Sequence, residues 1–63
     1  MEDKAALDEI DRKIQIVEDN LRDLIEQAAA FSGAADEERA AERIADQQAK
    51  LDALLKEREA LLR

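Results

Sequence analysis

Apolar residues recur between Leu7 and Phe31 at alternating steps of three and four residues. They stand at Leu7, Ile10, Ile14, Val17, Leu21, Leu24, Ala28 and Phe31. This seven-residue repeat is the pattern of a helix that packs lengthwise against another helix. No Gly or Pro interrupts residues 4–31, and Asp3 is of a residue type that caps helix N-termini. The sequence therefore predicts a helix over about residues 3–31.

The repeat is interrupted beside Gly33, the only glycine of the chain. The next large apolar residue is Ile44, which stands one residue short of the place that an unbroken repeat would give it. Glycine readily adopts the left-handed conformation that ends many helices. We therefore expect a turn over about residues 32–35 and a second helix over about residues 36–62.

The second predicted helix has its own apolar row, interrupted by two polar residues. It comprises Ala40, Ile44, Gln47, Leu51, Leu54, Arg58 and Leu61. In an antiparallel hairpin, the numbers of facing residues add to a constant. The two rows match when this sum is 68, from Leu7 with Leu61 to Ala28 with Ala40, which leaves a loop as short as helical hairpins use. The predicted fold is all-α, a single antiparallel helical-hairpin domain over residues 1–63.

A second row of residues lies beside the first and is too wide for one partner helix to cover. It comprises Ile25 on the first helix and Ala41, Gln48, Leu55 and Leu62 on the second. Burying each large apolar member would contribute about 1.5–3 kcal/mol. A chain of 63 residues with no Cys or His has neither a disulfide nor a zinc site to stabilise it. We therefore predict that two hairpins pair into a homodimeric four-helix bundle, with these five residues at the interface.

Two adjacent glutamines lie near the middle of the second helix. Gln47 occupies the packed row, and one interpretation is that it fixes register by meeting its symmetry mate or Asn20, at some cost in stability. The alternative is that one glutamine is half-exposed and merely tolerated. We assign the register role to Gln47 and the tolerated role to Gln48.

Arg58 and Ile16 also depart from the simple pattern. Arg58 stands in the packed row, where its stem can lie over apolar surface while its head reaches Asp11 or Asp8. Ile16 lies off the row on the first helix. It is either a single exposed apolar residue, which is common, or a contact for a further protein.

Charge is abundant and predominantly negative. The chain has 17 acidic and 10 basic residues, a net charge of −7, which repels phosphate backbones and anionic membranes. Acids stand four positions before bases in the pairs Asp8–Arg12, Glu9–Lys13, Glu18–Arg22, Asp46–Lys50, Asp52–Lys56 and Glu59–Arg63, an arrangement that supports exposed helix faces. No apolar run is long enough to span a membrane, and the first residues lack a signal-peptide core, so we expect a cytoplasmic protein.

The residue types required for most catalysis are missing. The chain has no His, Cys, Tyr or Trp, and Ser32 is its only hydroxyl side chain, better suited to capping than to attack on a substrate. No carboxylate falls in the predicted packed rows, as a di-iron bundle would require. We expect no enzyme, cofactor, metal or small-molecule substrate.

Protein–protein interaction or oligomerisation is the function that remains. The alternative comes from a resemblance in size and shape: the predicted dimer resembles the Rop family of small RNA-binding hairpin bundles, which implies RNA-binding regulation. No residue motif accompanies the resemblance. The basic residues are spread out and mostly paired with acids, and the single aromatic, Phe31, fits the apolar stripe, so we expect self-association and a possible protein partner rather than nucleic acid.

Overall fold

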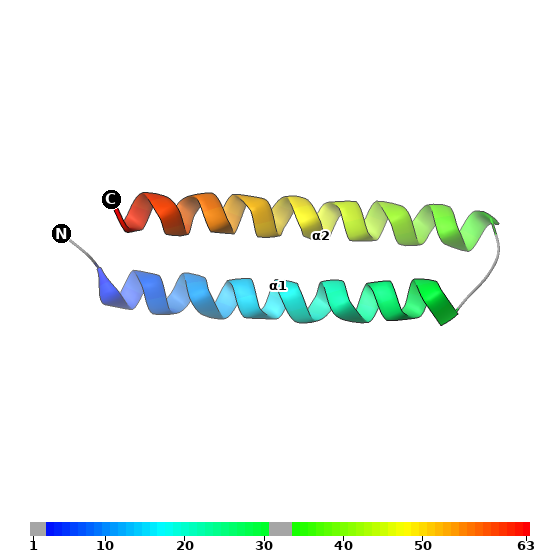
Figure 1. Ribbon diagram of the computed structural model, residues 1–63, viewed down its shortest axis with the longest axis horizontal. Coiled ribbons are helices and arrows are strands. Elements are labelled where there is room, and N and C mark those ends of the chain that lie inside the picture. The colour runs from blue at the N-terminus through cyan, green and yellow to red at the C-terminus, as the bar shows by residue number, and fades with distance from the viewer. Residues whose placement is uncertain (1–2, 31–33) are drawn as a thin grey trace.

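The computed structural model describes residues 3–30 and 34–63, with side chains in these ranges except those of residues 34–36. Within these ranges it contains two helices, α1 (Lys4–Ala30) and α2 (Ala34–Leu61). The helices run antiparallel and side by side, so that the start of α1 and the end of α2 lie at the same end of the molecule (Figure 1). The prediction of an all-α helical hairpin is confirmed.

Asp3 caps α1 as predicted. Its carboxylate Oδ1 accepts a hydrogen bond from the Ala6 backbone N–H at 3.2 Å, and its carbonyl accepts one from the Leu7 N–H at 3.0 Å. The first contact satisfies one of the N–H groups that a helix leaves free at its start, and the second begins the helical ladder. This geometry fixes where α1 begins.

The start of α2 differs from the sequence prediction. The helix begins at Ala34, inside the segment 32–35 that the sequence assigned to the turn. Alanine is the strongest helix former, which favours extending the helix toward the turn. The predicted roles of Gly33 and Ser32, and the place of Phe31 in the stripe, lie outside the described residues.

The two predicted rows form the seam, the contact between the helices. Ile10, Val17 and Leu21 are buried, with 6%, 9% and 7% of their surface exposed. The other described members are half-buried: Leu7, Ile14, Leu24, Ala28, Ala40, Ile44, Gln47, Leu51, Leu54, Arg58 and Leu61. The burial pattern follows the predicted seam, because helical periodicity aims these side chains at the neighbouring helix.

The hairpin is long and thin. Its extents are 50 × 14 × 10 Å and its radius of gyration is 14.7 Å, against about 11 Å for a compact chain of this length. Its accessible surface is 5059 Å², whereas a compact monomer of this mass exposes about 4,100 Å². A layer one helix thick cannot enclose its own apolar side chains, so the chain leaves roughly 1,000 Å² more exposed than a compact fold would.

Candidate interaction faces

The seam divides the surface of the hairpin into two faces. Lys13 of α1 and Lys50 of α2 line one groove, and Asn20 and Arg43 line another, so these seam-flanking positions share one face. The residues on the opposite flank of each helix therefore share the other face. They include Asp11, Glu18 and Ile25 on α1 and Ala41, Gln48, Leu55 and Leu62 on α2.

We call the second of these surfaces the Leu55 face, defined by Ile25, Ala41, Gln48, Leu55 and Leu62. All five residues are exposed. The large apolar members are about half-exposed: Ile25 is 54%, Leu55 47% and Leu62 45% exposed. The Gln48 amide donates to Asp52 Oδ1 at 3.2 Å, so its side chain has a partner on its own helix. The five residues predicted for a dimer interface thus lie on one side of the hairpin, where they are accessible to another molecule.

An ion pair joins the helices beside the Leu55 face. The Arg58 guanidinium Nε donates to Asp11 Oδ1 at 2.7 Å. Arg58 is half-buried at its seam position while its head reaches the acid, which is one of the two arrangements expected from the sequence. The contact agrees with the predicted register, in which Arg58 faces Ile10, the neighbour of Asp11.

The opposite face contains a groove with an apolar lining and a volume of about 360 Å³. We call it the apolar groove, and its residues are Lys13, Ile16, Val17, Lys50, Ala53 and Leu54. Ile16 stands at its edge with 59% of its surface exposed. The two lysines come from different helices, so the groove has a cationic residue on each wall. The off-row residue that the sequence singled out therefore belongs to a defined concave surface.

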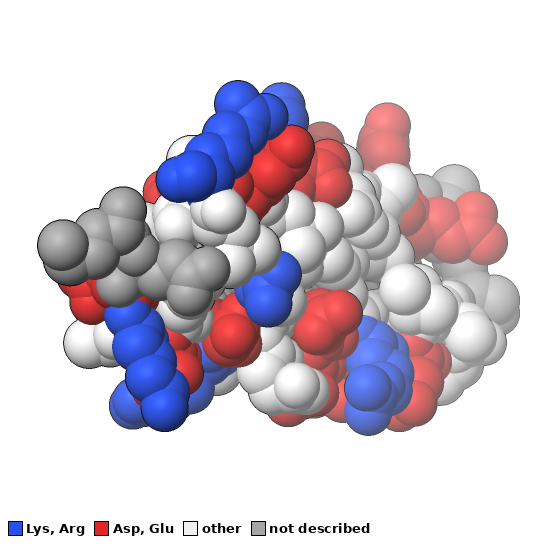
Figure 2. All heavy atoms as spheres, turned by 60° about the vertical axis from the view of Figure 1, so that its left-hand side comes forward, with Lys and Arg blue, Asp and Glu red and all other residues white. Residues whose placement is uncertain are grey.

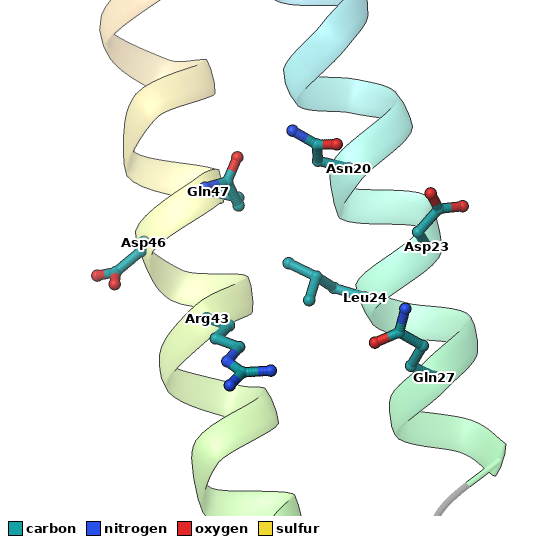
Figure 3. Close-up of a pocket in the computed structure, with 7 residues that line it drawn as sticks. All are labelled: Asn20, Asp23, Leu24, Gln27, Arg43, Asp46 and Gln47. Atoms are coloured by element: carbon teal, nitrogen blue, oxygen red, sulfur yellow. The ribbon is translucent and has the colours of Figure 1, made fainter.

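A second groove of about 370 Å³ lies on the same face, nearer the turn. We call it the polar groove, and its residues are Asn20, Asp23, Leu24, Gln27, Arg43, Asp46 and Gln47. Figure 3 shows Gln47 and Arg43 pointing from α2 toward α1, with Asn20 and Leu24 pointing back toward α2. Gln47 therefore shares a groove with Asn20, one of the two partners suggested for it.

The two grooves are lined by equivalent heptad positions, one heptad apart along each helix. The displacement runs forward along α1 and backward along α2, because the helices are antiparallel. The corresponding residues are Lys13 and Asn20, Ile16 and Asp23, Val17 and Leu24, Lys50 and Arg43, Ala53 and Asp46, and Leu54 and Gln47. Neither groove was predicted from the sequence. They could have been found by comparing the residues that flank the seam at positions seven apart, such as Ile16 with Asp23 and Ala53 with Asp46.

Charges of both signs are mixed over the surface. Figure 2 shows basic and acidic side chains on both sides of a band of uncharged atoms. The predicted pairs Glu9–Lys13 and Glu59–Arg63 are present at 3.6 and 3.1 Å. Arg22 instead lies 3.9 Å from Asp19, rather than pairing with Glu18, because positions three apart are also neighbours on a helix. These exposed pairs contribute little stability individually.

Metal-ligand clusters and membrane-spanning helices are absent from the described part of the chain. Among residues 3–30 and 34–63, no group of three or more Asp, Glu, His or Cys side chains is placed to hold a metal ion. Neither described helix combines the length and apolar character that a membrane crossing requires. In the same part of the chain, none of the polar or charged side chains is buried. The features left for functional reasoning are the Leu55 face and the two grooves.

The chain was also compared with known proteins. No protein-family model matches it, and neither a curated protein nor a solved structure matches it. The function therefore has to be argued from the exposed faces of the hairpin itself.

Proposed function

We propose that the chain is a non-enzymatic interaction module that self-associates through the Leu55 face into a homodimeric four-helix bundle. The observation that carries this proposal is the exposure of Ile25, Leu55 and Leu62 on one side of a hairpin one helix thick. Within residues 3–30 and 34–63, no further element covers them. A second hairpin laid against this face covers them by the same helix packing that forms the seam.

The exposed area supports this assembly. A standard interface buries about 800 Å² on each partner. The hairpin exposes 5059 Å², roughly 1,000 Å² more than a compact chain of its mass. Pairing would therefore bring the exposed surface of each chain close to that of an ordinary small domain. A twofold axis is the simplest arrangement, because it lets one face serve both copies.

The RNA-binding alternative has less support from the surface. The face with the grooves carries Lys13, Lys50 and Arg43, but Asp23 and Asp46 lie among them. Phosphate recognition relies on cationic side chains gathered on one surface, and here acids interrupt them within a chain of net charge −7. A gel shift with structured RNA at moderate salt tests this directly, and retardation would favour the RNA-binding alternative.

The dimer is tested by sedimentation equilibrium of the wild type and of Leu55→Lys. We expect a dimer for the wild type. In the variant, each copy loses the interface burial of a leucine that is half-exposed in the hairpin, worth about 1 kcal/mol, and places an ammonium group in the interface. The variant should therefore dissociate and lose helicity on dilution. Ala49→Lys is the matched control, because it adds the same charge at an exposed position outside both faces. A wild-type monomer that stays fully helical when dilute would contradict the proposal.

A further inference from the structure

We propose that the apolar groove is a docking site for an acidic amphipathic helix of another protein. One large apolar side chain of that helix enters the groove beside Ile16, and carboxylates on either side of it contact Lys13 and Lys50. The inference rests on the proposed function in one respect: it names the partner of the face that a dimer through the Leu55 face leaves open.

The apolar groove is shallow and open to solvent, with an apolar floor on which a large side chain of a partner can lie. Val17 and Leu54 belong to the seam beneath it, while Ile16 and Ala53 flank it on the two helices. The small side chain of Ala53 leaves space opposite Ile16. Binding sites for helices commonly use an apolar anchor of this kind in a groove between two helices.

The polar groove limits how far a partner helix can make apolar contacts along this face. One heptad toward the turn, Ile16 is replaced by Asp23, Ala53 by Asp46 and Leu54 by Gln47. A second hairpin packed lengthwise would need apolar residues to continue along this face, as they do along the seam. Toward the turn, the apolar lining thus ends within one heptad, and toward the chain ends Glu9 and Glu57 take the places of Ile16 and Lys50. A short helical segment with one anchor fits this interrupted lining better than a second copy of the chain does.

Charge complementarity defines the partner as acidic. Lys13 and Lys50 stand on opposite walls, one from each helix, within a chain that is otherwise predominantly acidic. The only ion pair of Lys13 among the described residues is the one with Glu9 at 3.6 Å, and both side chains are mostly exposed. Such pairs exchange readily, because they contribute little free energy. A partner carboxylate can therefore engage Lys13 without disrupting the fold.

The net charge separates this partner from other anionic ligands. Nucleic acids and anionic lipid surfaces present extended negative charge, which a chain of net charge −7 repels. A single carboxylate pair beside an apolar anchor needs only the two local lysines. The groove therefore fits an acidic helix in preference to RNA or a membrane.

The test uses two helical peptides of about 20 residues, long enough to form a helix in water. Each carries one Leu anchor in an Ala-rich sequence, with Glu four residues before and after the Leu in the acidic probe and Lys at those positions in the basic probe. Fluorescence anisotropy measures the binding of each labelled peptide to the wild-type protein. We expect the acidic probe to bind and the basic probe to bind at least about tenfold more weakly.

Two substitutions on opposite faces separate this inference from the proposed dimer. Ile16→Asp gives the apolar groove the residue type found at the matching place in the polar groove, and should weaken the acidic probe about tenfold or more without altering the sedimentation of the dimer. Ile25→Asp should dissociate the dimer while leaving the affinity for the probe within about twofold. Both positions are exposed in the hairpin. Probe binding to Ile25→Asp is measured at a protein concentration at which sedimentation shows a monomer and circular dichroism shows that it is still helical.

Reversing the charge of the two lysines should produce a gain of binding to the basic probe. Lys13→Glu combined with Lys50→Glu should reverse the preference, so that the basic probe binds more tightly than the acidic probe. Equal binding of both probes to the wild type, or acidic-probe binding unaffected by Ile16→Asp, would overturn the inference. Dissociation of the dimer by Ile16→Asp would also overturn it, because a second hairpin would then occupy the groove.

Discussion

The apolar and polar grooves share a backbone and differ only in side chains. Each lies between α1 and α2 on the same face, with volumes of about 360 and 370 Å³. One presents Ile16 and Ala53 between two lysines, and the other presents Asp23 and Asp46 beside an arginine and three amides. The comparison shows that the helical pair forms a similar concavity at two successive heptads, and that six side chains decide whether its lining is apolar or polar.

The seam is also more apolar and better buried beneath the apolar groove than beneath the polar groove. Val17, under the apolar groove, is 9% exposed, whereas Leu24, under the polar groove, is only half-buried. Gln47 replaces an apolar residue in the seam of the polar groove. We infer that the hairpin is more stable along the apolar groove than along the polar one. Substitutions in the seam test this difference in stability.

Val17→Asp and Leu24→Asp compare the two seams directly. A carboxylate at Val17 replaces a side chain that is only 9% exposed, and its desolvation costs several kcal/mol even with Lys13 and Lys50 on the groove walls. This cost is comparable to the whole stability of a core this small, so the variant should lose most of its helicity at 25 °C. Leu24→Asp places its carboxylate beside polar side chains and solvent, and should retain helicity with a lower urea midpoint. Urea titrations followed by circular dichroism, at one protein concentration, measure both. Equal losses would show that the two seams are equally well buried.

Gln47→Leu and Leu54→Gln exchange the seam residues of the two grooves. Gln47→Leu should raise the free energy of unfolding by about 1–2 kcal/mol, because a half-buried amide becomes apolar. Leu54→Gln should lower it by a similar amount. Thermal and urea unfolding measure both variants. A loss of stability in Gln47→Leu would instead indicate that the amide makes a hydrogen bond worth more than apolar packing, with Asn20 the nearest candidate in the shared groove.

Asp11→Asn tests how much the ion pair with Asp11 stabilises the hairpin at Arg58, the other polar residue of the seam. Arg58 has a carboxylate at 2.7 Å, but both side chains are more than two-fifths exposed. We expect a loss of only about 0.2–1 kcal/mol, because solvent and salt screen such a pair. The difference between wild type and variant should shrink further in 1 M NaCl, where the Debye length is about 3 Å. A loss above about 2 kcal/mol would show that this contact holds the terminal end of the hairpin closed.

The sequence predicted the features that depend on periodicity. Each described seam residue is buried or half-buried, and the contact from Arg58 to Asp11 agrees with the predicted register. Asp3 was predictable as a cap because its side-chain chemistry and its place before the apolar stripe both favour that role. These features follow from local spacing along one helix or from the match between two stripes.

Features that depend on three-dimensional detail were missed. Which acid Arg22 contacts is a choice between rotamers of similar energy, so Asp19 could not be preferred to Glu18 from spacing alone. The apolar groove joins Lys13 and Lys50, which are far apart in sequence, and its recognition requires knowing which flanks of the two helices share a face. The start of α2 at Ala34 likewise reflects the small energy differences at helix ends.

The first residue of α1 and the last residue of α2 lie at one end of the molecule (Figure 1). A mechanical load applied to those two points pulls across the helical pair rather than along it. The seam residues nearest the load, Leu7 and Leu61, and then the ion pair of Arg58 with Asp11 therefore bear the tension before the rest of the seam. Under such a load the two helices separate progressively, one layer of the seam after another. The unfolding force is therefore lower than it would be if all the contacts were sheared at the same time.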